Sequence, residues 1–147
     1  MTTERAPHLA RSYRQSAALP YRYRDGDLEV LLVTSRKRGR WIAPKGIVER
    51  GLTPAASAAK EALEEAGVEG DVSEHALGSY RHSKWHGVRN VELFPLLVTT
   101  ELDQWDESAF RERRWMPVTK AMSKVDNLKL ARLIGRLPEF VGVAQPR

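Results

Sequence analysis

The sequence contains no cysteine, which excludes disulfide bridges, a thiolate nucleophile and cysteine-based zinc sites. It also lacks any apolar run approaching the roughly 18 residues that a membrane-spanning helix needs. The start of the chain, MTTERAPHLARSYR, has no apolar core of the kind found in signal peptides. We therefore expect a cytoplasmic protein without a membrane partner.

Internal repeats, low-complexity tracts and an interdomain linker are absent as well. A chain of 147 residues is long enough for one domain with a proper core and too short for two comfortable ones. We expect a mobile N-terminal arm over residues 1–12, one domain over residues 13–142 and a C-terminal tail over residues 143–147.

Basic residues are scarce in the centre of the chain, although the net charge is +5. Residues 1–50 carry eleven Lys/Arg against five Asp/Glu, whereas residues 51–71 carry one against five. An acidic centre between basic segments suits a small anionic substrate. A duplex-binding protein would not normally place acidic residues in the middle of its footprint.

That acidic centre is predicted to be a helix on local chemistry alone. Thr53 is a suitable N-cap, and Pro54 fits the first helical position, where its missing N–H costs nothing. The residues from Ala55 to Ala66 are mostly strong helix formers without a β-branched member. Gly67 stands where a left-handed residue ends a helix.

Three carboxylates share one face of this helix. At about 100° per residue, Glu61, Glu64 and Glu65 fall within one sector, where they repel one another and only Lys60 offers local relief. Such a face is usually a solvated surface. The alternative is that divalent cations remove the repulsion, because clustered carboxylates with a main-chain carbonyl are the hard oxygen ligands that Mg²⁺ and Mn²⁺ accept.

The spacing around the helix resembles the Nudix box. Lys60 follows Gly46 by fourteen residues and opens the run KEALEEAGV, which ends at Val68. The preceding WIAPKG, from Trp41 to Gly46, resembles the branch that contains diphosphoinositol polyphosphate and diadenosine polyphosphate hydrolases. This resemblance implies an α/β fold, a Nudix-type α/β/α sandwich with a mixed β-sheet.

The resemblance also implies an activity, the divalent-metal-dependent hydrolysis of pyrophosphate bonds with Mg²⁺ or Mn²⁺ as cofactor. The implied substrate is a nucleoside polyphosphate or a diphosphoinositol polyphosphate, with an RNA 5′ end as the one nucleic-acid alternative. The metal ligands would be Gly46, Glu61, Glu64 and Glu65. The catalytic carboxylates would be Glu64, Glu65 and Glu112, with Glu107 as another candidate general base. Phosphate would be bound by Ser35, Arg36, Lys45 and Arg89.

Two positions depart from the box. Lys60 stands where the family has Arg, and Leu52 stands where it has its first Glu. Lys is a flexible point charge and should orient a carboxylate less rigidly than the planar fork of Arg. These departures support a competing hypothesis, a non-catalytic Nudix module that binds a nucleotide or an inositol phosphate. Neither the oligomeric state nor the physiological substrate follows from the sequence.

The remaining segments give a coarse outline of the sheet and of the last helix. Before the box we expect an edge strand at residues 12–23, interrupted at Pro20, and a hairpin to a strand at residues 28–34. After the box we expect a turn at residues 69–71, a loop at residues 81–87 and a strand at residues 89–98. Asp126 is expected to cap a final helix with an apolar stripe at Leu128, Ala131, Ile134 and Leu137, ended by Pro138.

Overall fold

The computed structural model describes residues 14–84 and 87–144. The strands are β1 (Arg14–Arg24), β2 (Asp27–Thr34), β3 (Trp41–Ile42), β4 (Lys45–Ile47), β5 (Val68–Val72), β6 (Gly78–Lys84), β7 (Gly87–Glu101) and β8 (Arg113–Pro117). The helices are α2 (Pro54–Glu61), the π-helical turn η1 (Ala62–Ala66), α3 (Val118–Lys124), α4 (Leu128–Gly135) and α5 (Leu137–Ala144). The predicted arm at residues 1–12 lies outside the described residues. Helix α5 extends into the predicted tail.

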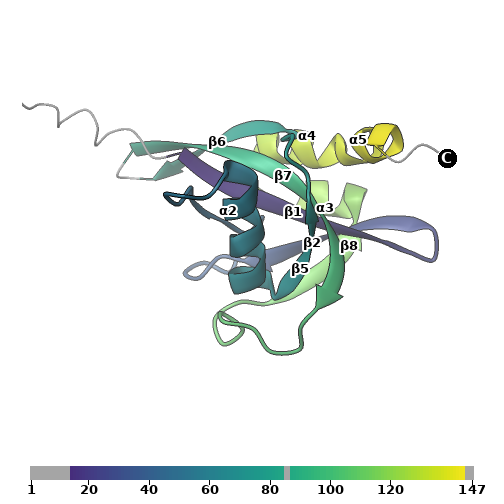
Figure 1. Cartoon of the computed structure of the whole chain (residues 1–147), viewed down its shortest axis with the longest axis horizontal. Helices are drawn as coiled ribbons and strands as arrows, with labels where there is room; N and C mark the ends of the chain where they lie inside the picture. Colours follow the sequence, from purple (N-terminus) through teal and green to yellow (C-terminus); the bar gives the residue numbers. More distant parts are fainter. Residues whose placement is uncertain (1–13, 85–86, 145–147) are drawn as a thin grey trace, which may run out of the picture.

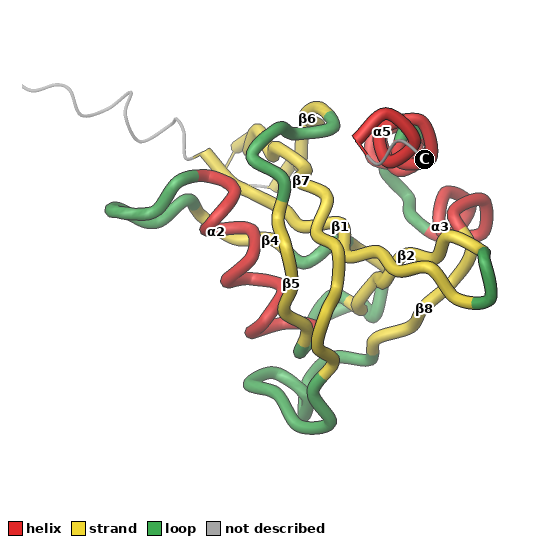
Figure 2. The backbone as a smooth tube through the Cα atoms, turned by 45° about the vertical axis from the view of Figure 1, so that its right-hand side comes forward, coloured by secondary structure: helices red, strands yellow, loops and turns green. Residues whose placement is uncertain are grey.

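The strands form one mixed sheet of eight strands with the main order β3-β2-β1-β7-β5. Strands β4, β6 and β8 pair with β1, β7 and β2, respectively. Among the strands in the described residues, only β1 and β7 run parallel, and the other pairs are antiparallel. Figures 1 and 2 show α2 on one face of this sheet and α3 to α5 on the other. The predicted α/β/α sandwich is therefore confirmed.

Strand β1 lies in the middle of the sheet, so the prediction of an interrupted edge strand is wrong. Pro20 is tolerated because it lies in the gap between two strands that pair with the same side of β1. On the same side of β1, pairing with β4 ends at Ala17 and pairing with β2 begins at Tyr21. The amide of Ala18 donates toward Pro44 on that side. By alternation, the missing N–H of Pro20 falls where no ladder bond is needed.

Strand β7 confirms the strand predicted at residues 89–98 and extends beyond it at both ends. Two other predictions around it are wrong. The residues Glu69 to Asp71 pair within β5, where a bulge at Glu69 and Gly70 takes the place of the expected turn. The segment from Arg81 to Lys84 belongs to β6, which pairs with β7 as a hairpin. Residues 85 and 86 of the predicted loop lie outside the described residues.

Alternate residues of β1 face two separate cores. Ala18 packs with Ala55 and Ala58 of α2, whereas Ala17 and Leu19 belong to the cluster beneath α4 and α5. Most buried residues on α2 are small, so this helix lies close to the sheet. The close approach brings the carboxylates at the end of α2 near the backbone of β4.

The C-terminal segment forms two helices where one was predicted. Asn127, not Asp126, caps α4 by accepting from the amide of Leu130 at 3.0 Å. Pro138 lies in the first turn of α5, where its missing N–H is not needed, rather than ending a helix. Leu128 is 73% exposed and not part of the core. The residues of α4 that are buried are Leu130, Leu133 and Ile134.

Candidate active site

The box helix begins and ends as the sequence predicts. The side chain of Thr53 accepts a hydrogen bond from the amide of Ala56 at 3.0 Å, and Pro54 occupies the first turn. Gly67 adopts the left-handed conformation, with φ of 68°. The π-helical turn at Ala62–Ala66 was not predicted. Single π-turns inside helices often occur at functional sites, and this one carries Glu64 and Glu65.

Glu61 lies against the backbone of the turn that precedes the helix. A Cβ atom added to Gly46 would collide with the Glu61 carboxylate, so the absence of a side chain at Gly46 makes room for that group. The position therefore requires glycine for space rather than for an unusual φ angle. The contact also brings the Glu61 carboxylate next to the main chain that bears the Gly46 carbonyl.

Glu65 is fixed by the same turn and by an arginine from a distant loop. The amide of Lys45 donates to Glu65 Oε1 at 3.2 Å. Arg111 Nη2 lies 3.5 Å from Glu65 Oε2, and the two side chains are only 7% and 9% exposed. Arg111 also donates to the carbonyl of Thr34 at 2.8 Å and to Glu107 Oε1 at 2.7 Å. It therefore links Glu65 to the end of β2 and to the acidic loop.

Burial and mutual repulsion disfavour the charged forms of this carboxylate pair. Desolvation, followed by the charge of Glu65, raises the pKa of Glu61 to about 8. Desolvation also raises the pKa of Glu65, against the opposing effects of Arg111 and of the Lys45 amide. Two neighbouring carboxylates, one buried and one half-buried, that resist ionising together are a favourable place for a cation.

The donors fit a divalent cation that keeps part of its water shell. In residues 14–84 and 87–144, no three acidic or histidine side chains converge closely enough to enclose a metal ion. Mg²⁺, however, is commonly held by one or two carboxylates and retains several waters. Glu61, Glu65 and the Gly46 carbonyl supply a donor set of that kind, all oxygen and carrying negative charge.

Glu64 pairs with Lys60 and lies apart from the contacts that hold Glu61 and Glu65. Lys60 Nζ lies 2.6 Å from Glu64 Oε2 and 2.9 Å from Glu49 Oε2, and both contacts raise the pKa of Lys60. Lys60 thus bridges the helix to the loop that contains Glu49. Although Lys replaces the Arg of the box, it holds two carboxylates.

The acidic loop between β7 and β8 holds the end of the box helix. Trp105 Nε1 donates to the carbonyl of Glu65 at 3.0 Å, and Arg113 Nη1 donates to that of Ala66 at 2.9 Å. The Arg113 guanidinium lies 3.9 Å from the centre of the Trp105 ring. These residues and Arg111 were missed by sequence reasoning. The arginine-rich run RERR, at residues 111–114 where β8 begins, was the available signal.

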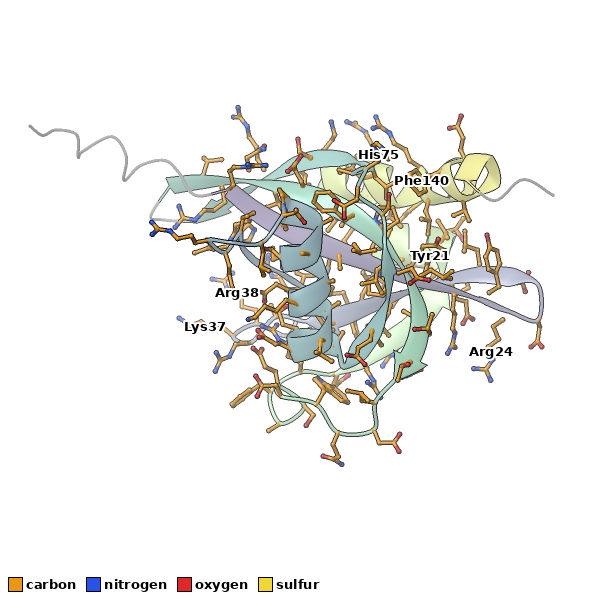
Figure 3. The ribbon with its side chains drawn as sticks, in the orientation of Figure 1. Tyr21, Arg24, Lys37, Arg38, His75 and Phe140 are labelled. Carbon is orange, nitrogen blue, oxygen red and sulfur yellow. The ribbon has the colours of Figure 1, made fainter. Side chains whose placement is uncertain are left out.

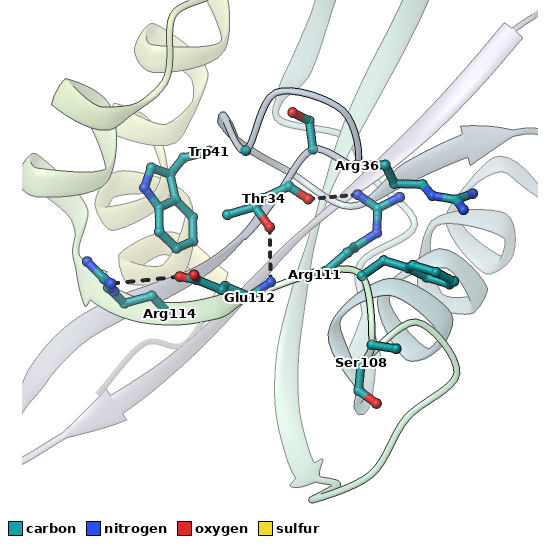
Figure 4. A pocket seen from close by; sticks show the side chains of 11 residues that line it. Thr34, Arg36, Trp41, Ser108, Arg111, Glu112 and Arg114 are labelled. Atoms are coloured by element: carbon teal, nitrogen blue, oxygen red, sulfur yellow. Dashed lines mark hydrogen bonds and ion pairs between the residues drawn. The ribbon is translucent and has the colours of Figure 1, made fainter.

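Ser35, Arg36 and Glu112 line a groove of about 550 Å³ at the end of β2 (Figure 4). The hydroxyl of Ser35 accepts from the amide of Arg40 at 3.0 Å and so shapes the basic loop. Arg36 stacks over the ring of Phe110 at 4.5 Å. The Glu112 carboxylate is 73% exposed and lies 4.0 Å from Arg114, while its amide donates to Thr34 Oγ1. Arg111, which contacts Glu65, also lines this groove. The groove is thereby connected to the carboxylate site.

The side chains of Lys45 and Arg89 lie on the opposite face of the sheet from α2. Lys45 pairs with Ala17, whose side chain belongs to the core beneath α4. Arg89 alternates with Val91 and Leu93 of the same core and is half-buried. Lys45 lines a hollow of about 330 Å³ with Tyr80 and His82. The predicted phosphate-binding residues thus form two groups rather than one.

The rest of the basic loop is turned toward solvent. Figure 3 shows Lys37 and Arg38 projecting from the loop beside α2, while Arg24 projects from the distant β1–β2 hairpin. Arg40 pairs with Asp126 at 3.1 Å. Arg36 therefore lines the groove at the end of β2, whereas Arg40 lines the hollow beside Lys45.

The fold and the spacing of these residues agree with known proteins. The family model described as NUDIX domain matches residues 13–137, so this chain belongs to the Nudix family. Nudix hydrolase 21, chloroplastic, from Arabidopsis thaliana is 38% identical over 122 residues, covering 78% of this chain and 61% of the relative. Diphosphoinositol polyphosphate phosphohydrolase 3-beta from Bos taurus is 32% identical over 124 residues, covering 79% and 74%.

Solved structures support the same fold. The crystal structure of C. elegans Ap4A hydrolase matches with a TM-score of 0.74 and 19% identity, covering 89% of this chain and 99% of that one. This chain spans about three fifths of the length of the plant relatives that it matches. None of the helices in the described part of the chain is long and apolar enough to cross a membrane. The cytoplasmic location stays a prediction, since several relatives are named as chloroplastic or mitochondrial.

Proposed function

We propose that this protein is a divalent-metal-dependent hydrolase of pyrophosphate bonds. The observation that carries this proposal is the packing of the half-buried Glu61 and the buried Glu65 against the backbone of Lys45 and Gly46. These two carboxylates and the Gly46 carbonyl would hold Mg²⁺ or Mn²⁺, with Glu64 completing the outer side of the site. A bound cation would polarise a phosphoryl oxygen and make water nucleophilic near neutral pH.

The remaining steps belong to side chains of this chain. Arg36 and Ser35 on one side, and Lys45 and Arg89 on the other, bind phosphate oxygens and neutralise their charge. A carboxylate accepts the proton of the attacking water, and Glu107 and Glu112 are the candidates in the loop before β8. Glu107 is connected to Glu65 through Arg111, whereas Glu112 lies in the open groove.

The proposed substrates are densely anionic, namely diadenosine polyphosphates and diphosphoinositol polyphosphates. The name of the bovine relative supports the second class. The basic loop supports both classes, because its Arg36 lies in a groove together with Ser35. Nucleic acid is proposed as a partner only in the form of an RNA 5′ end.

The test is phosphate release, after coupling to a phosphatase where needed, from a panel of nucleotide and inositol polyphosphates with Mg²⁺ or Mn²⁺. We expect release that requires the metal and falls by at least about 10³-fold in Glu65→Gln, because a removed ligand acts on the chemical step itself. Glu69→Gln, an exposed carboxylate beyond the helix, is the matched control. Tight binding of one panel member without release would instead identify a non-catalytic binding module, as Lys60 and Leu52 suggest.

A further inference from the structure

Ser16 carries a buried hydroxyl that no group in the described part of the chain satisfies. The residue is 0% exposed, and its Oγ atom has no hydrogen-bond partner among the described residues. Ser57, the other buried serine of this layer, differs because its Oγ accepts from the amide of Glu49 at 3.1 Å. An unpaired buried hydroxyl is unfavourable for folding, so its presence in β1 needs a reason.

The strand register places this hydroxyl beside the Glu61 carboxylate. Ser16 stands opposite Gly46 in the antiparallel β1–β4 pair. Its side chain shares the sheet face of Ala18, which packs against α2. The Cβ positions of opposed residues in such a pair lie about 4.5–5.5 Å apart. The Glu61 carboxylate occupies the space where a Gly46 Cβ would be. Ser16 is therefore its neighbour on the floor of the site.

The other flank of Ser16 offers no competing partner of the same kind. Glu92 of β7 stands beside Ser16 in the parallel β1–β7 pair. Its carboxylate is turned toward Arg14, with Arg14 Nη2 and Glu92 Oε1 at 3.1 Å. Glu61, beside Gly46, is thus the carboxylate to which we assign the Ser16 hydroxyl.

We propose that Ser16 is a positioning residue for Glu61. Its hydroxyl rotates to donate to a carboxylate oxygen of Glu61 and so fixes over Gly46 the carboxylate that would hold a divalent cation. This inference rests on the proposed function, because it requires a cation at Glu61 and Glu65. The cation favours the ionised carboxylate, which is the stronger acceptor for the hydroxyl.

The test is direct Mn²⁺ binding, measured by electron paramagnetic resonance of the free ion, with melting temperatures in EDTA as the measure of folding. Ser16→Ala should weaken Mn²⁺ binding by about tenfold, as for other groups that orient metal ligands. Its melting temperature in EDTA should equal or exceed that of the wild type, because an unpaired hydroxyl is removed. Ser57→Ala, which removes a paired hydroxyl, should show the reverse, a lower melting temperature with nearly unchanged affinity for Mn²⁺.

Wild-type Mn²⁺ affinity in Ser16→Ala overturns the proposal. If Ser16→Ala lowers both the affinity and the melting temperature in EDTA, Ser16→Cys decides, since it fills a similar volume with a weak donor. Weak binding in Ser16→Cys supports the proposal and wild-type binding overturns it. If Glu61→Gln binds Mn²⁺ as tightly as the wild type does, the proposed metal site is overturned as well. This variant therefore distinguishes a failure of the metal site from a failure of the Ser16 proposal alone.

Discussion

Arg111 reaches the carboxylate of Glu65 from a loop more than forty residues along the chain, with Nη2 and Oε2 at 3.5 Å and both side chains nearly buried. The same guanidinium bonds Thr34 and Glu107, so its removal takes a partner from three groups. We predict that Arg111→Met lowers stability by about 3 kcal/mol, the usual result of breaking a buried ion pair. The melting temperature should fall by roughly 10 °C.

Arg114→Met is the control, because the Arg114 side chain is 56% exposed and its contact with Glu112 is 4.0 Å long. Its melting temperature should stay close to that of the wild type. Mg²⁺ should stabilise Arg111→Met more than wild type, because the cation replaces the lost positive charge beside Glu65. Equal melting temperatures for the two variants would contradict the structural role of Arg111.

Gly46→Ala tests the contact between the box helix and the turn before it. The added Cβ collides with the Glu61 carboxylate and must displace it from the Gly46 backbone. We predict a loss of activity of about 10²-fold, the size expected from misplacing a catalytic group by about 1 Å. Gly142→Ala in α5 is the control, since nothing lies within 4 Å of its added Cβ. Full activity in Gly46→Ala would show that Glu61 does not act from this position.

The raised pKa of Glu61 predicts a pH dependence of stability. The folded protein holds a proton that the unfolded chain releases near pH 4.5, so this stabilising contribution is present below that pH and is lost as the pH rises to about 8. Urea unfolding in EDTA should therefore give a lower free energy of unfolding at pH 9 than at pH 6. The decline should be smaller in Glu61→Gln and smaller with Mg²⁺ present. A decline of the same size in all three experiments would contradict the assignment.

Lys60 tests whether the departure from the box matters for catalysis. Lys60 holds Glu64 and Glu49 together, at 2.6 and 2.9 Å, so Lys60→Met should let the two carboxylates separate. We predict a fall in kcat of about tenfold, as for other residues that orient a metal site. Lys60→Arg, which restores the family residue, should keep or raise kcat. An unchanged kcat in Lys60→Met would show that the bridge has no part in catalysis.

The features that were predicted most accurately from the sequence are those that neighbouring residues determine. The start and end of the box helix depend on Thr53, Pro54 and Gly67, each of which acts on its own neighbours. The predicted helix cap at Asp126 was wrong by one residue. Aspartate and asparagine are both good caps, and the packing of the following leucines decides between them. The prediction of an edge strand at Pro20 was wrong because a proline is tolerated in a strand according to which strands lie beside it.

Arg111, Trp105 and Ser16 show why part of the site was beyond sequence patterns. Their partners, Glu65 for the first two and Glu61 for the third, are distant in the chain, and no periodicity connects them. The carboxylates that we propose as metal ligands could be predicted because the box places them on one helix. The groups that contact those carboxylates come from strands and loops that are far apart in the sequence, and only the folded structure shows that they meet.

The parallel pairing of β1 with β7 has a consequence for how the site is made during synthesis. The turn with Lys45 and Gly46 rests on β1 through β4, and β1 shares its longest pairing with β7, late in the chain. Bringing such distant segments together is entropically costly and slow. A nascent chain that ends before β7 would carry the whole Nudix box without the strand that completes its floor. We expect the ability to bind a cation to emerge only in the last third of translation.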